Sequence, residues 1–379
     1  MTTVIDTGRA GPQTHAFVVG VDHYPFCGPQ GAQDGQFASL ARGIPDLSCA
    51  TASARAVATW LCENLLQDGY RPLGSLELLL STRAPAHVDV GHGPIPVDTA
   101  TFDHTEQAFD AWYQRCDQHA DNVALLFFFG HGLRLRSADV LLLGDVGRRR
   151  NAFFDHAWDF RRTKLAMSQC RSETQCFFID ACRVEAAEDL EVDTDGARSL
   201  RQPPKRPQLR HAPVVYSTTP GDPARGLAGH PTAFTEAVLA SLAGRAAVQM
   251  GQHWEVRTDN LVATVNRVLN WADPEARRQL ACGGESPGDG VVRRLASDPV
   301  VPFQITCDPR EAIGRADLEL VRGTGRLVGG PEYEAWRSSA PVGEHQLRAS
   351  FPAGDYHDGT GLVHIHPPHR SFELAVDQA

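Results

Sequence analysis

The feature that most constrains the fold of this chain is a series of short apolar runs that alternate with segments of helical spacing. Residues 123–129 (VALLFFF) are apolar throughout, as expected of a strand that is buried on both faces. Similar strand-like runs lie at 15–21, 76–80, 140–143, 176–179 and 213–217. Apolar residues at helical spacing predict helices at 50–66, 105–120 and 160–167. The alternation predicts an α/β fold in which helices sandwich a mostly parallel sheet.

The character of the sequence changes near residue 290. The stretch 282–290 (CGGESPGDG) is rich in turn formers. Short strand candidates follow at 301–306, 318–321, 346–351, 362–366 and 372–376. Because 379 residues exceed what one hydrophobic core usually holds, we expect two domains. The first would cover 1–290, and a small all-β, sandwich-like domain would cover 291–379.

Composition narrows the class of protein. With 42% apolar residues, 22% charged residues and a net charge of −10, the chain fits a globular protein and not a nucleic-acid binder. Its nine cysteines include no Cys-x-x-Cys pair, which favours reduced thiols over disulfides or a zinc site. The N-terminus has no apolar signal region, and the longest apolar run falls well short of the roughly 20 residues that cross a bilayer. We expect a cytoplasmic protein without a membrane partner.

Polar residues follow three of the predicted strands. His131 comes after 123–129 within Gly-His-Gly, Cys182 follows 176–179, and Ser217 and Thr218 follow 213–216. In open α/β sheets, sites gather at the carboxyl ends of the strands. A thiol is mostly protonated at neutral pH, so thiol catalysis requires a neighbouring base such as histidine. The sequence therefore points to Cys182 and His131 as a candidate catalytic pair.

Similar residues elsewhere have simpler explanations. The tripeptide Gly-His-Gly recurs at 91–93, but there it lies in a Pro-flanked segment that we assign to a loop. Cys176 begins its predicted strand and does not end it, so we interpret it as a buried structural thiol.

Several motifs together carry a family resemblance. They are GVDHYP after the first strand, FFGHG, FFIDACR, YSTTPG and HPTAFTEAVLASL, and they cover roughly residues 14–270. His131 precedes Cys182 by about 50 residues, the order and spacing found in caspases. The chain resembles caspase-like cysteine peptidases, in particular the branch of metacaspases and prokaryotic caspase homologues.

The resemblance implies a role for each matching residue. Cys182 would be the nucleophile, His131 the general base and acid, and the backbone N–H groups of Gly132 and Cys182 the oxyanion hole. The glycine at position 132 is consistent with the oxyanion hole, because a glycine lets substrate approach the N–H group without a side chain in the way. The implied activity is that of a cysteine-type endopeptidase, a hydrolase, with residues 1–290 as its peptidase domain.

Asp180 is the candidate for substrate specificity. Residues two apart on a strand point the same way, so Asp180 and Cys182 can face one cleft. A negative charge would raise the pKa of the thiol, so the carboxylate suits cation binding better than activation. Caspases carry glutamine at this position, whereas metacaspases carry aspartate, which helps to accept Arg or Lys before the cut bond. We therefore predict cleavage after Arg or Lys, with Ser217 and Thr218 also lining the substrate site.

Two departures from the metacaspase pattern bear on that specificity. Ser53 stands where the resemblance leads us to expect a second acid, and Asp22 or Asp46 would have to replace it. Caspases read aspartate partly with an arginine soon after YSTTPG, and here Arg225 follows that motif. Cleavage after aspartate is therefore the alternative specificity.

Residues 184–211 form a segment that opens acidic and closes basic and Pro-rich, and we expect it to be an exposed, mobile linker. It contains Arg201, Lys205, Arg206 and Arg210, which a protease specific for basic residues could cut. Self-processing in this linker is a hypothesis.

The remaining expectations concern cofactors and partners. His364, His366 and His369 form HIHPPH without acidic or thiol partners nearby, so we predict a packing or docking strand there and no metal site. We predict no cofactor, while calcium as an activator stays open. The partners would be a protein or peptide substrate, which the family resemblance extends to a gasdermin-like pore former, and an unidentified activator.

We expect a regulated effector in stress, cell death or antiphage defence. A non-catalytic binding protein with this fold, and an esterase or acyltransferase using the same thiol, are the alternatives.

Overall fold

The computed structural model describes residues 2–32, 34, 37–91, 93–135, 138–181, 184–185, 196–206, 208, 210–217, 227–272, 281–283, 289–332 and 334–379. The chain forms two compact units. The first comprises residues 1–239 and 257–293, and the second comprises residues 240–256 and 294–379. The domain limits of 1–290 and 291–379 stay a prediction.

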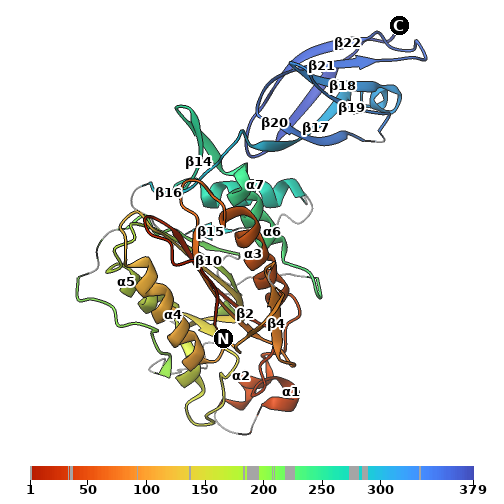
Figure 1. Ribbon diagram of the computed structural model, residues 1–379. Helices are drawn as coiled ribbons and strands as arrows, with labels where there is room; N and C mark the ends of the chain where they lie inside the picture. The colour runs from red at the N-terminus through yellow and green to blue at the C-terminus, as the bar shows by residue number, and fades with distance from the viewer. Residues whose placement is uncertain are drawn as a thin grey trace. The chain divides into compact units, whose positions relative to one another are not determined.

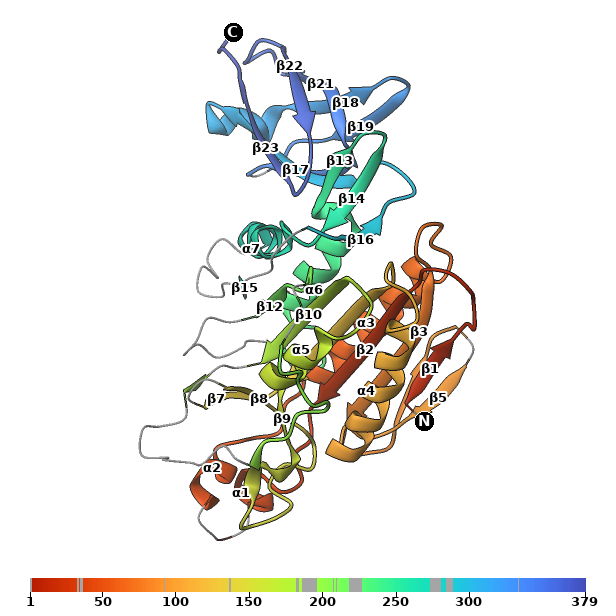
Figure 2. The same cartoon turned by 90° about the vertical axis from the view of Figure 1, so that its left-hand side faces the viewer.

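The first unit is built on a sheet with, among the described residues, seven strands in the order β1-β3-β2-β6-β10-β12-β15 (Figures 1 and 2). They are β1 (Thr3–Asp6), β2 (Thr14–Val21), β3 (Leu73–Ser81), β6 (Val123–Gly130), β10 (Thr174–Ala181), β12 (Val214–Tyr216) and β15 (Cys282–Gly283). The five inner strands run parallel to one another. β1 and β15 pair antiparallel at the two edges. The mostly parallel α/β sheet that the apolar runs predict is confirmed.

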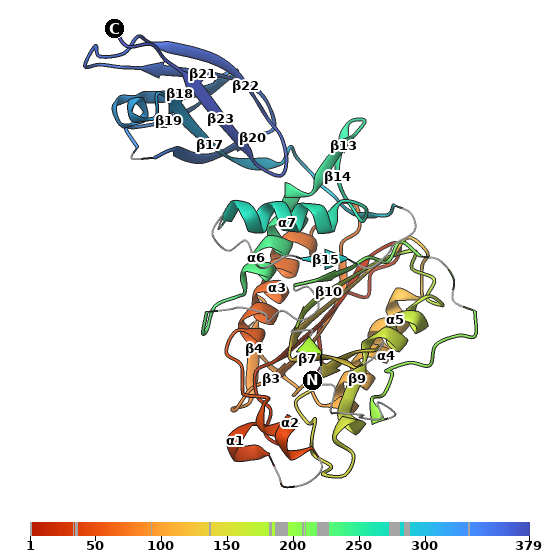
Figure 3. The ribbon, with the colours of Figure 1, turned by 180° about the vertical axis from the view of Figure 1, so that it is seen from behind.

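Helices cover both faces of this sheet. The helices described in this part of the chain are α1 (Gly28–Gly31), α2 (Ala38–Arg42), α3 (Ala50–Leu65), α4 (Phe102–Cys116), α5 (Phe160–Met167), α6 (Ala233–Ala240) and α7 (Leu261–Ala272). α4 and α5 lie on one face, with α3 and α6 on the other (Figures 1 and 3). Every residue of β2, β6 and β10 is buried, which explains their unbroken apolar runs.

Specific contacts fix the helices against the sheet. On α4, Phe109 and Trp112 are three residues apart and both pack their rings on Phe17 of β2. On the other face, α3 approaches β2 at Gly20, where a Cβ atom would lie 2.7 Å from Cβ of Ala54. Glycine at position 20 therefore allows the close packing of α3 on the sheet.

Short strands lie next to the carboxyl ends of the central strands (Figure 2). They are β7 (Gly132–Leu135), β8 (Ala138–Leu142), β9 (Ala157–Asp159) and β11 (Val184–Glu185), paired in the order β11-β7-β8-β9, with a 3₁₀ turn at Phe153–His156. β4 (Ala86–Asp89) and β5 (Pro94–Val97) form a separate hairpin. The Asp89 carboxylate accepts hydrogen bonds from the N–H groups of Gly91 and Gly93, which closes the turn of that hairpin. Gly91 and Gly93 thus lie in a loop as predicted, and His92 lies outside the described residues.

The prediction of an exposed linker is wrong for residues 196–200. Ala197 and Leu200 are buried in the core of the first unit. The backbone of Arg198 pairs with the β9 segment, donating to Ala157 and accepting from Asp159. These contacts form because the polar linker contains two apolar side chains that reach the core.

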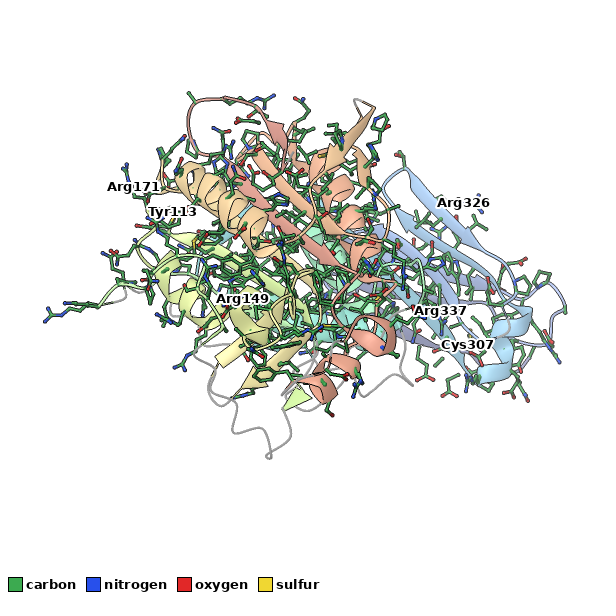
Figure 4. All side chains as sticks on the ribbon, turned by 90° about the horizontal axis from the view of Figure 1, so that it is seen from below. Tyr113, Arg149, Arg171, Cys307, Arg326 and Arg337 are labelled. Carbon is green, nitrogen blue, oxygen red and sulfur yellow. The ribbon has the colours of Figure 1, made fainter. Side chains whose placement is uncertain are left out.

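Arg201, at the end of this packed stretch, is also held. Its guanidinium lies 3.7 Å from the ring centroid of Tyr113 and 3.6 Å from the carboxylate of Asp110, both on α4. Tyr113 is labelled on this helix in Figure 4. Residues 186–195 of the linker lie outside the described residues.

The second unit is rich in strands. One sheet has the order β20-β17-β23 and another the order β19-β18-β21-β22. Their strands are β17 (Val300–Asp308), β18 (Asp317–Arg322), β19 (Gly325–Gly329), β20 (Trp336–Pro341), β21 (Gly343–Ser350), β22 (Gly359–Ile365) and β23 (Arg370–Ala375). A hairpin of β13 (Ala247–Met250) and β14 (His253–Arg257) also belongs mainly to this unit, and β16 (Val291–Arg294) leads into it.

The second unit has its own core, in which Phe303 and Trp336 meet edge to face with their ring centroids 5.2 Å apart. All five predicted strands of this region are found. β19 and β20 were not predicted, because Gly, Arg and Ser interrupt their apolar pattern. The unit also contains a 3₁₀ helix at Arg310–Arg315 and a π-helical turn at Ser241–Arg245, so it is β-rich without being purely β.

Candidate active site

The carboxyl edge of the central sheet brings several of the sequence-predicted residues together. β10 pairs with β6 so that Ala181 lies opposite Gly130. In the sequence, His131 directly follows Gly130 and Cys182 directly follows Ala181. His131, Gly132, Asp180, Ser217 and Asp22 are described, whereas Cys182, Thr218 and Arg225 lie outside the described residues.

The imidazole of His131 is oriented by a backbone carbonyl. Its Nε2 atom lies 2.8 Å from the carbonyl oxygen of Pro45. Because a carbonyl only accepts, Nε2 must carry the hydrogen, and in the neutral ring Nδ1 keeps its lone pair. His131 is thus set up as a base at Nδ1.

Tyr24, in the loop that follows β2, supports the same histidine. The backbone N–H of His131 donates to the Tyr24 hydroxyl at 2.8 Å, and the two ring centroids are 5.0 Å apart. A Cβ atom on Gly130 would lie 2.9 Å from that hydroxyl, so glycine is required there. On the other side, the His131 carbonyl accepts from the N–H of Leu142 at 2.9 Å. The backbone at His131 is therefore fixed by contacts on both sides.

The surroundings of His131 also set its protonation. Burial lowers the pKa of the imidazole, while the Pro45 carbonyl and the Asp46 carboxylate partly oppose that effect. The net direction is downward, so the ring is neutral at pH 7. A neutral imidazole with Nδ1 available is the form that accepts a proton from a thiol.

Asp180 lies at the end of β10 and is almost fully buried. One carboxylate oxygen, Oδ2, accepts a hydrogen bond from the Thr232 hydroxyl. The other oxygen, Oδ1, is buried and has no hydrogen-bond partner among the described residues, and the same is true of the Ser217 hydroxyl. Burial raises the pKa of Asp180, while the Thr232 hydroxyl opposes this effect, and so, more weakly, does the Ser217 hydroxyl, which lies close to the carboxylate without the geometry of a hydrogen bond. Asp180 therefore has one buried carboxylate oxygen that accepts no hydrogen bond from the described residues.

Ser53, which stands where the resemblance leads us to expect a second acid, lies one contact away from Asp180. Its hydroxyl accepts a hydrogen bond from the N–H of Thr232 at 3.1 Å, and Thr232 in turn donates to Asp180. Ser53 therefore supports the residue that positions Asp180, and it adds no charge.

Asp22 and Asp46 have different partners. The Asp22 carboxylate accepts from the N–H groups of Ala50 and Thr51 at 2.9 and 3.2 Å, so it caps the N-terminus of α3. Burial raises the pKa of the nearby Cys49 thiol, and the charges of Asp180 and Asp22 raise it further. Both carboxylates therefore act on one place at the start of α3.

Asp46 faces a different group of residues. Its carboxylate accepts from the N–H of Tyr24 at 2.9 Å, from Nδ1 of His23 at 3.0 Å, and from the Arg83 guanidinium. Burial alone would raise the pKa of Asp46, but these hydrogen bonds and the charges of His23 and Arg83 outweigh it, so the pKa is lowered. Asp46 is ionised and its acceptor positions are largely used.

Sequence reasoning missed Pro45, Tyr24 and Arg83. Tyr24 lies inside the GVDHYP motif, which offered a signal for it. A backbone carbonyl such as that of Pro45 leaves no signal in the sequence, because every residue type has a backbone carbonyl.

Comparison with known proteins assigns the chain to a family. The family model of the caspase domain matches residues 64–283, which is more than half of the chain. The protein belongs to the caspase-domain family, and the resemblance seen in its motifs is confirmed. No curated protein matches the chain. In the part of the chain that the structure describes, no helix is long and apolar enough to cross a membrane.

Proposed function

We propose that this protein is a cysteine endopeptidase of the caspase and metacaspase type that hydrolyses proteins after Arg or Lys. Cys182 is the nucleophile and His131 the general base and acid. The N–H groups of Gly132 and Cys182 bind the oxyanion. The enzyme acts as a regulated effector in stress, cell death or antiphage defence, and its protein substrates include a pore former of the gasdermin type.

The orientation of His131 supports this chemistry. His131 Nδ1 takes the proton of the Cys182 thiol, and the thiolate attacks the scissile carbonyl. The imidazolium then gives its proton to the leaving amine as the C–N bond breaks and the acyl-enzyme forms. Water, deprotonated by the neutral ring, attacks the acyl-enzyme and releases the new carboxyl terminus and the thiol. The Pro45 carbonyl keeps the same ring orientation through all these steps.

One observation supports the proposed specificity, namely that Oδ1 of Asp180 has no hydrogen-bond partner among the described residues. A buried carboxylate with unused acceptor capacity is unfavourable unless a donor or a cation reaches it. The guanidinium of arginine or the ammonium of lysine supplies charge-assisted donors of this kind. Asp22, which acts with Asp180 on the Cys49 thiol, adds a second negative charge nearby.

The test is hydrolysis of a peptide library varied at the residue before the cut, with wild-type protein and Cys182→Ala in parallel, with and without calcium. Cleavage after Arg or Lys that disappears in the variant supports the proposal. Cleavage after aspartate would transfer the specificity to Arg225. If no peptide is hydrolysed under any condition, labelling with an electrophilic peptide ending in arginine decides between the remaining explanations. Labelling of Cys182 would mean that an activator is missing, and no labelling would mean that the fold serves binding.

A further inference from the structure

A cavity of the first unit lies beside the candidate active site, and the proposed chemistry gives it no role. It has a volume of about 440 Å³ and is lined by His23, Asp46, Arg83 and three prolines, Pro25, Pro29 and Pro45. Pro45 joins the two sites, because its carbonyl orients His131 and the same residue lines the cavity.

The order of strands places this cavity relative to Asp180. β6, which leads into His131, lies between β10 on one side and β2 on the other, with β3 beyond β2. Asp180 is on β10, whereas His23 follows β2 and Arg83 follows β3. In this strand order Asp180 and Arg83 lie on opposite sides of His131, with Asp22 at the end of β2 between His131 and Arg83.

This arrangement has a consequence that rests on the proposed function. If Asp180 binds the side chain before the cut bond, the peptide crosses His131 at the cut, because His131 must protonate the leaving amine. The residues after the cut then continue toward β2 and β3, where the cavity lies.

The polar groups of the cavity offer more donors than acceptors. The Asp46 carboxylate already accepts from Tyr24, His23 and Arg83. Arg83 gives one N–H to Asp46, its side chain is 76% exposed, and among the described residues its other N–H donors have no acceptor. An approaching side chain that accepts hydrogen bonds and carries negative charge fits this surplus, and a guanidinium binds a carboxylate with two parallel hydrogen bonds.

We propose that this cavity is the subsite for an acidic residue, Asp or Glu, among the first residues after the cut bond, and that Arg83 selects it. The enzyme would then read opposite charges on the two sides of the cut. Asp180 reads a basic residue before it, and Arg83 reads an acidic residue after it.

The test uses full-length protein and peptides with arginine before the cut and Glu, Gln or Lys at each of the first three positions after it. At one of these positions we expect kcat/KM for Glu to exceed that for Gln about three- to five-fold, the range of an exposed ion pair, with Lys lowest. Arg83→Gln removes the difference between Glu and Gln, and Arg83→Glu reverses the order so that Lys becomes the best residue. Arg149→Gln is the matched control, because Arg149 is also an exposed arginine paired with an aspartate, Asp155, but lies outside the cavity.

Reversal of the order by a charge reversal cannot come from a merely structural effect of Arg83. A wild-type enzyme that cuts after arginine with equal rates for Glu and Gln at all three positions overturns this inference and leaves the proposed function intact. If no peptide is cut, calorimetric binding of the tripeptides Glu-Gly-Gly and Gln-Gly-Gly to Cys182→Ala decides the matter separately. Equal binding of the two peptides overturns the subsite, and tighter binding of the Glu peptide that Arg83→Gln removes supports it.

Discussion

In the proposed function a single carboxyl group, that of Asp180, determines the specificity, so its amide analogue gives the most direct prediction. Asp180→Asn keeps the shape and the contact with Thr232 but removes the charge. We expect kcat/KM for substrates with Arg or Lys before the cut to fall by roughly 100-fold or more, since losing one partner of a buried charge pair costs about 3–5 kcal/mol. Steady-state kinetics on matched Arg and Gln peptides measure it.

The stability of Asp180→Asn shows whether a loss of activity comes from the lost charge or from impaired folding. Burial raises the pKa of Asp180 in the folded protein, so its ionisation opposes folding once the pH rises through that pKa. The amide removes this cost, and thermal unfolding at pH 7 should occur at the same or a higher temperature than in wild type. Asp155→Asn, a carboxyl outside the substrate site, serves as the control for activity. A variant that loses activity and stability together would contradict the assignment.

Asp46 gives a second prediction, because its charge raises the pKa of His131 against the effect of burial. In Asp46→Asn that opposition is lost, so the pKa of His131 falls further below its ordinary value. The acidic limb of the kcat/KM profile reports the ionisation of this base in the free enzyme and should move to lower pH. A limb that stays in place or moves to higher pH would show that Asp46 does not act on His131.

The residues of the site differ in how far the sequence reveals them. His131 and Asp180 were found because each follows an apolar strand and belongs to a recognisable motif. The contact between Asp46, His23 and Arg83 joins three segments that are distant in the chain, and no local pattern records such a meeting. Asp22 was chosen for its charge, but its hydrogen bonds with Ala50 and Thr51 come from the way α3 docks on the end of β2.

Among the strands, β2 contains a buried histidine that makes stability depend on pH. Burial lowers the pKa of His15 to about 4, with a further decrease from Arg115 and a smaller opposing effect from Asp6. The unfolded chain binds a proton near pH 6.5, so the stabilising contribution is complete above that value and is lost as the pH falls toward 4. We expect this histidine to cost about 3 kcal/mol of unfolding free energy over that range.

The measurement is denaturant unfolding between pH 7 and pH 4 for wild type, His15→Gln and His87→Gln. His15→Gln should flatten the decline, because glutamine has no proton to gain, while the exposed His87 serves as the control. Parallel curves for all three proteins would mean that another group governs the acid sensitivity of the first unit.

The accuracy of prediction also differs among the elements. β6 is buried on both faces and almost entirely apolar, so the sequence shows it without ambiguity, and the apolar run 176–179 marks the centre of β10, whose other buried positions include Thr174, Gln175 and Asp180. β7 is short and contains Arg134, so no apolar run marks it, whereas the predicted run 140–143 marks most of β8. Their position follows from pairing with each other and with β9, which is a tertiary property.

For the molecule as a whole, the packed linker refines the self-processing hypothesis. Residues 186–195 contain no Arg or Lys, Arg201 is held by Tyr113 and Asp110, and Arg206 precedes a proline. Arg210 donates to Gln208, and its Nε atom is buried. Lys205 is exposed, and the described residues provide it with no ion pair.

We therefore predict a self-cut between Lys205 and Arg206, which mass spectrometry of active enzyme would identify; no acidic residue follows this bond within three residues, so the cut should be slower than that of a peptide that fits the proposed Arg83 subsite. Lys205→Gln should prevent it, while Arg201→Gln, a basic residue of the same segment, should leave it. Because β12 pairs with β10 and β15, the two fragments should elute together in native size-exclusion chromatography and separate only on denaturation. A cut at Arg201, or fragments that separate without denaturant, would contradict this.

The Pro45 carbonyl also sets a limit on what mutagenesis can reveal about this enzyme. An alanine scan removes side chains, and alanine at position 45 would still present a carbonyl to His131. Such a scan would therefore not detect the contribution of the Pro45 carbonyl, the group that orients the histidine of the proposed catalytic pair. Only a change that moves the backbone of that loop, such as a deletion between α2 and α3 or an amide-to-ester replacement that weakens this carbonyl as an acceptor, would expose its contribution.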